Sequence, residues 1–192
     1  MSLLVAPHPS RLHSWTGIPL APKFEIVVKP NEWAKAGREQ VRVAAATTPT
    51  KQLQQKFWLA LVEHLAAKAP QIRPQKPRPQ HWLNNSIGRS GFALNITANT
   101  RDERLGVELW IPGPQAKQHF ANLSAQKQEI EAKLGFVLDW QELPDAKAVR
   151  IASWYPHASI EDEQSWHEYI DWLTQRLVKM DAVLRPIVKL LP

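Results

Sequence analysis

Residues 92–111 read FALNITANTRDERLGVELWI, and this stretch decides the fold. Apolar side chains occupy alternate positions on both sides of a polar centre, which is typical of two strands that each have one apolar face. A slip of one residue would move every side chain to the other face, so parity fixes how the two strands pair. A register with Asn95 opposite Glu108, or one with a turn two residues longer, keeps apolar and polar residues on separate faces. The stretch is therefore a predicted hairpin whose turn lies at residues 101–102, or in a slightly longer loop around them.

The elements on either side of this hairpin follow from apolar periodicity. Apolar residues recur every four positions from Leu53 to Leu65 and predict a helix that ends before Pro70. The other predicted elements are strands at 81–87, 138–143 and 149–155, a helix at 116–134, and a last helix for which Ser159 and Asp162 resemble a capping box. The order α-β-β-β-α-β-β-α predicts an α+β domain at residues 51–192, with three main helices and a mixed or mostly antiparallel sheet of about five strands.

Residues 1–50 have a different character and are predicted to form an N-terminal arm. Prolines are frequent there, and the only regular patterns are a short strand at 24–28, a short helix around 33–43 and a linker that follows it. The arm also carries Trp15, Phe24 and Trp33, which could dock on a partner.

The composition bounds the class of protein. The 192 residues include no cysteine, which excludes disulfide scaffolds, thiolate zinc sites and cysteine nucleophiles. No stretch approaches the roughly 20 apolar residues of a membrane span, and the N-terminus lacks the design of a signal peptide, so we expect a cytoplasmic protein. A net charge of +6 favours contact with polyanions. The 9 tryptophans can build a core, an interface or a platform on which bases stack.

No self-sufficient catalytic signature is present, so we expect no catalytic activity from the domain by itself, no cofactor and no bound metal. The element order also permits a degenerate restriction-endonuclease-like core, whose metal-binding acids come from the second and third strands. Glu108 lies in the third predicted strand, but the second has no acid, and Trp110 stands where that core has a lysine. Metal-dependent cleavage needs the full acid cluster, so a site with these residues would be catalytically inactive.

Positive charge is concentrated between Arg73 and Arg89, around Trp82. The prolines of this segment favour an extended backbone, and an extended basic segment beside an aromatic side chain could follow a phosphate backbone. The alternative is a solvated crossover whose tryptophan belongs to the core. A turn at residues 88–91 is expected to present Arg89 outward. The residues predicted to bind nucleic acid are Arg73, Lys76, Arg78, His81, Trp82, Arg89 and Arg150, and those of a polar sheet face are Asn95, Thr97 and Glu108.

The motif RPQKPRPQHWLNNSIGRSGF at residues 73–92 resembles the hallmark of a prokaryotic domain of unknown function. Shorter sequence cues of the same family lie at 107–109, 125–131, 147–151, 172–173 and 185–186. The resemblance as a whole runs from Lys51 to Leu191. In that family the domain often follows a predicted restriction-endonuclease-like nuclease domain, and the joining segment resembles residues 21–33. This chain departs from that arrangement because it lacks the nuclease half. The resemblance implies a nucleic-acid-processing or phage-defence setting and assigns no catalytic residues.

Three hypotheses follow. The first is a module that binds nucleic acid, DNA or RNA, or targets it for a nuclease within the same chain or a separate one. The second is a protein-interaction or dimerisation module, either for a nuclease partner or for a second copy of the chain. The third is a divergent metal-dependent nuclease that uses Glu108.

Overall fold

The structure, a computed structural model, describes residues 48–192. Most of the predicted arm at 1–50, with its strand, its helix and its aromatic residues, lies outside the described residues. The first described helix, α2 (Pro49–Lys68), begins slightly earlier than predicted because Thr48 caps it, accepting a hydrogen bond from the Lys51 amide. Proline at the first helical position suits this start, since its missing N–H would have no partner there.

Within residues 48–192, five strands form one antiparallel sheet, as the element order predicted. They are β1 (Trp82–Ser86), β2 (Ala93–Asn99), β3 (Arg104–Pro112), β4 (Asp139–Gln141) and β5 (Ala148–Tyr155), and their order in the sheet is β1-β2-β3-β5-β4. The predicted register of the central hairpin is confirmed, with Asn95 opposite Glu108. The last paired residues are Asn99 and Arg104, so the turn is the longer loop, residues 100–103. The likeness of the element order to a restriction-endonuclease-like core stays a prediction.

Two helix predictions need correction. The helix expected at 116–134 is two helices, α3 (Ala116–Ser124) and α4 (Lys127–Leu134), and the bend between them lets both bury apolar residues. The last helix, α5 (Trp166–Leu190), starts later than the expected cap at Ser159. The Ser159 hydroxyl accepts from the Glu161 amide in a local turn, and a short 3-10 turn, η1 (Glu163–Ser165), leads into the helix. Serine favours such turns for the same reason that it favours caps.

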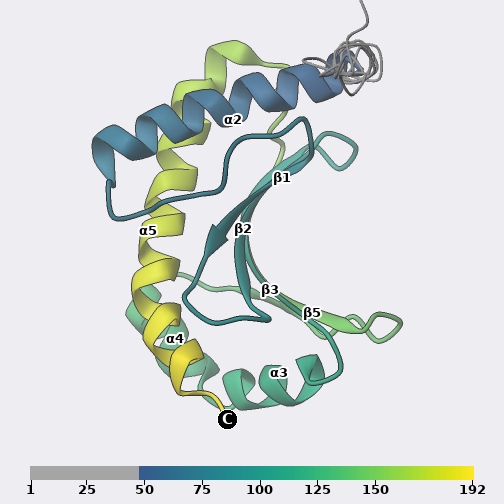
Figure 1. The fold of residues 1–192 in the computed structure, drawn as a ribbon, viewed down its shortest axis with the longest axis vertical. Helices are drawn as coiled ribbons and strands as arrows, with labels where there is room; N and C mark the ends of the chain where they lie inside the picture. Colours follow the sequence, from purple (N-terminus) through teal and green to yellow (C-terminus); the bar gives the residue numbers. More distant parts are fainter. Residues whose placement is uncertain (1–47) are drawn as a thin grey trace, which may run out of the picture. The chain divides into compact units, whose positions relative to one another are not determined.

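The core lies between the helices and one face of the sheet. Helix α5 runs along this face, with α2 across its N-terminal half and α4 beside its C-terminal half (Figure 1). The buried apolar side chains of α2 and α5 meet those that alternate along β2, β3 and β5, such as Leu94, Leu109 and Ile151. Within residues 48–192, none of the helices covers the opposite face of the sheet (Figure 1). None of these helices is long and apolar enough to cross a bilayer.

Candidate ligand-binding face

The uncovered face of the sheet is built from rows of side chains that run across the strands. Paired residues of neighbouring strands point to the same face, so the register of the sheet defines each row. The middle row is polar and reads Asn84, Asn95, Glu108, Ala152 and Asp139. One flanking row reads Trp82, Thr97, Gly106 and Trp154, and the other reads Ser86, Ala93, Trp110, Arg150 and Gln141. Tryptophans therefore stand on both sides of a polar strip.

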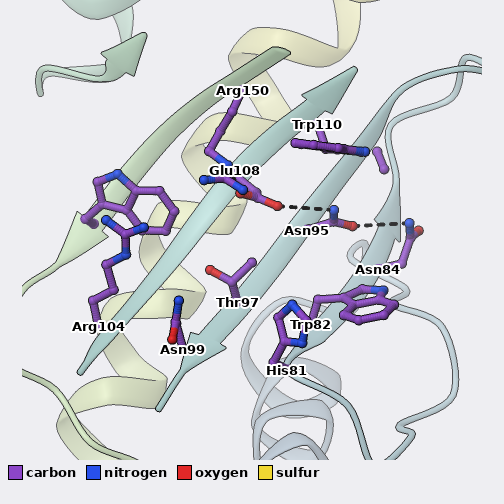
Figure 2. A pocket seen from close by; sticks show the side chains of 12 residues that line it. His81, Trp82, Asn84, Asn95, Thr97, Asn99, Arg104, Glu108, Trp110 and Arg150 are labelled. Carbon is purple, nitrogen blue, oxygen red and sulfur yellow. Dashed lines mark hydrogen bonds and ion pairs between the residues drawn. The ribbon is translucent and has the colours of Figure 1, made fainter. Parts of the chain in front are cut away.

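A pocket of about 430 Å³ lies over this part of the face. Small or short side chains, Ala93 and Thr97 among them, leave room at its centre, and the three tryptophans of the flanking rows line it. Figure 2 shows Trp82 and His81 at one side of the hollow, Trp110 and Arg150 at another, and Arg104 at a third. The volume falls within the range of about 300–1,000 Å³ that is typical of small-molecule sites.

A chain of polar contacts follows the middle row. The Asn84 amide donates to Asn95 Oδ1 at 3.2 Å, and Asn95 Nδ2 donates a long contact of 3.5 Å to Glu108 Oε1 (Figure 2). Arg150 Nε lies 2.6 Å from Glu108 Oε2, and Arg150 also donates to Gln141 at 3.3 Å. Glu108 is only 5% exposed. A carboxylate at such depth needs a compensating cation, and Arg150 supplies it.

The aromatic walls are held by identifiable contacts. The Trp154 indole lies directly on the backbone of Gly106, where a Cβ would stand 2.2 Å from the ring. Its Nε1 donates to Asp139 at 2.8 Å, and the Arg104 guanidinium lies 4.3 Å from the ring centroid. Trp82 is held less firmly and is 38% exposed. Trp154 is thus fixed in place with positive charge beside it, and Trp82 is the more exposed indole.

The structure brings together most, but not all, of the residues that the sequence predicted for a site. His81, Trp82, Arg150 and the polar trio Asn95, Thr97 and Glu108 all line the pocket. Arg73, Lys76 and Arg78 are exposed on the segment that runs beside β1, which it joins through a bridge between Pro74 and Asn85, and they do not line the pocket.

Arg89 does not point outward, and that prediction is wrong. The turn at 88–91 does connect an antiparallel pair, β1 and β2. Its arginine, however, folds back onto the C-terminal end of α5, where it donates to the carbonyls of Val188, Leu191 and Pro192. These carbonyls have no partner within the helix, so a guanidinium with several donors satisfies them together.

Sequence reasoning missed several residues of the pocket: Asn84, Arg104, Trp110 and Trp154. Parity along the third strand already placed Trp110 on the same face as Glu108, so that signal was present. The same parity placed Arg104 on this face, whereas Trp154 required the pairing of β3 with β5, which places Gly106 opposite Trp154.

The histidines do not form a metal centre within the described part of the chain. His64 and His167 both contact Asp171, at 3.0 and 3.5 Å, while Glu163 pairs with Lys56. Among residues 48–192, no group of three or more His, Cys, Asp or Glu side chains has the arrangement of a metal site.

The fold and the site together define an α+β domain whose antiparallel sheet is covered by helices on one face and carries an aromatic, polar pocket on the other. The chain belongs to the family described as domain of unknown function DUF4268, whose family model matches residues 53–188. No curated protein matches the chain. A chain in the solved structure of the HopA1-SchA chaperone-effector complex aligns with 13% identity and a TM-score of 0.33, over 62% of this chain and 94% of that chain. A likeness at that TM-score carries no argument about function.

Proposed function

We propose that the uncovered sheet face binds single-stranded nucleic acid. One observation carries the proposal: Trp82, Trp110 and Trp154 line a single pocket together with Arg104 and Arg150. Unpaired bases stack on aromatic side chains whatever their sequence, and guanidinium groups contact phosphates and add cation–π attraction. A sheet face with such residues is also a common way to hold single-stranded RNA.

The charges around the pocket support the same proposal. The chain has a net charge of +6, and Arg73, Lys76 and Arg78 are exposed on the segment beside β1. A strand that leaves the pocket past β1 would meet these cations. The association with a nuclease, which the family resemblance implies, remains part of this proposal: the domain would deliver a bound strand to a nuclease in the same chain or in a partner.

The nuclease alternative has weaker support. It rests on Glu108, whose carboxylate is engaged by Arg150. Glu108 is also the one carboxylate among the described residues that line the pocket. Since metal-dependent cleavage uses several ligands to fix its ion, the pocket is better suited to binding than to that chemistry.

The test is a titration of fluorescently labelled single-stranded DNA and RNA, followed by anisotropy at several salt concentrations. Contact with at least two phosphates, through Arg104 and one of the cations beside β1, predicts that the logarithm of the affinity falls against the logarithm of the salt concentration with a slope of about −1.4 or steeper, from about 0.7 per phosphate on single strands. Trp82→Ala should weaken binding by about 1–3 kcal/mol, the usual loss of one base stack.

Matched controls separate the pocket from general effects of charge and aromatic loss. Lys133 is exposed on α4, so Lys133→Ala removes one cation on the helix side, and Trp172→Ala removes an indole from α5. Both should leave the affinity unchanged. An absence of binding at low salt, or equal losses in the pocket variants and the controls, would refute the proposal.

A further inference from the structure

The pocket contains a feature that stacking alone does not require: a buried, charged carboxylate. Glu108 is 5% exposed and its neighbour Asn95 is 8% exposed, yet both line the pocket. Burying a charge is costly even when it is paired, and an apolar residue would pack at this place at lower cost. A carboxylate held at the floor of a pocket is able to select among ligands by their hydrogen-bond donors.

The protein leaves part of this carboxylate's capacity unused. An ionised carboxylate offers about four acceptor positions and no donor. Arg150 forms an ion pair with Oε2, which is fully buried, and the described contact to Oε1 is the long one from Asn95 at 3.5 Å. The amides of Asn84 and Asn95 each have a second N–H that the contacts along the row do not use. The floor therefore accepts N–H donors at Glu108 and offers N–H donors beside it.

Guanine is the base whose edge complements this floor. Its N1–H and N2 amine are adjacent donors, and its O6 is an acceptor on the other side of N1. Adenine and cytosine each present an unprotonated ring nitrogen, an acceptor, next to their amine, and uracil and thymine present one N–H between two carbonyl oxygens. Each of these would place an acceptor against the carboxylate, which is unfavourable in a buried site.

We propose that the pocket recognises a guanine base, with Glu108 Oε1 accepting from both its N1–H and its N2 amine and with Asn95 or Asn84 donating to its O6. Trp82 and Trp110, which stand on opposite sides of the polar row, supply the stacking surfaces. Arg104 lies at the rim, where it can meet the phosphate of the same nucleotide (Figure 2). This inference rests on the proposed function, because it names the base that the bound strand places in the pocket.

The experiment compares oligouridines that carry one central guanine, adenine, cytosine or hypoxanthine, titrated by anisotropy against the full chain. Loss of a hydrogen bond to a charged group weakens binding by about tenfold or more, so guanine should exceed adenine by at least that factor. Hypoxanthine, which lacks the N2 amine, should fall between them. Guanosine monophosphate should compete better than adenosine monophosphate. If guanosine monophosphate competes as well as the guanine oligomer, the natural ligand is a free nucleotide. If it competes far more weakly, the natural ligand is a strand.

Protein variants then tie the preference to the carboxylate. Glu108→Gln should bring the guanine and hypoxanthine oligomers to the same affinity, while Glu129→Gln, at an exposed acid on α4, should leave the difference intact. If circular dichroism shows that Glu108→Gln does not fold, the comparison of the four bases on the unaltered protein still tests the guanine preference. Equal affinity for guanine and adenine, with binding still sensitive to Trp82→Ala, would overturn the guanine inference and leave the proposed function standing. Binding of none of the oligomers would overturn both.

Discussion

The contact between Gly106 and the Trp154 indole leads to the sharpest prediction about how the face is built. A Cβ at residue 106 would lie 2.2 Å from Cε3 and 2.5 Å from Cζ3 of the ring. Carbon atoms do not approach so closely, so in Gly106→Ala the indole must retreat by roughly 1 Å or more, with a typical overpacking cost of about 1–3 kcal/mol. The movement would also stretch the hydrogen bond from Trp154 to Asp139.

A double-mutant cycle isolates this contact. In a Trp154→Ala background the ring is gone, and the next nearest atom to the added Cβ is the Ser153 carbonyl oxygen, at 3.0 Å. Gly106→Ala should therefore cost at least about 1 kcal/mol less in that background than in the unaltered chain. Urea unfolding followed by far-UV circular dichroism gives all four free energies of unfolding. An equal cost in both backgrounds, or no cost in the unaltered chain, would show that the indole does not rest on Gly106.

Other predictions concern residues away from the pocket floor. Arg89→Ala should lower the free energy of unfolding by about 1–3 kcal/mol in urea, because it leaves the carbonyls at the end of α5 without a donor, and oligonucleotide affinity should stay unchanged. The Leu138 amide, together with the Trp140 indole N–H, holds the pKa of Glu131 below its ordinary value. This contribution to stability is complete above the ordinary pKa of a glutamate and is lost as the pH falls through the lowered value. Between neutral pH and about pH 3.5, the free energy of unfolding in urea should therefore fall less for Glu131→Gln than for the unaltered chain. An equal fall in both proteins would contradict this prediction.

Local signals in the sequence were sufficient for the central hairpin. The parity of β2 and β3 excluded a register slipped by one residue, because the strands follow each other directly and each has one apolar face. The same signal placed Asn95, Thr97 and Glu108 on one face. The break between α3 and α4 was not visible, since apolar spacing continued across it.

Distant contacts could not be derived in this way. β5 pairs with β3 across an intervening pair of helices and β4, and no local pattern states which strands become neighbours. Trp154 therefore entered the site only with the structure. Arg89 shows the same limit, because a charged residue in a turn is usually solvated, and its partners lie at the far end of the chain. Sequence composition located a basic segment, whereas the sheet register located the pocket.

The most direct test of the central claim observes the tryptophans themselves. Each indole N–H gives its own signal in a proton–nitrogen correlation spectrum, and the signals can be assigned by single substitutions. On addition of a single-stranded oligonucleotide, the signals of Trp82, Trp110 and Trp154 should shift together. Those of Trp166, which donates to the Ile160 carbonyl in the core, and Trp172 should remain in place. Shifts confined to Trp166 or Trp172, or no shift at saturating oligonucleotide, would show that the uncovered sheet face is not the binding surface.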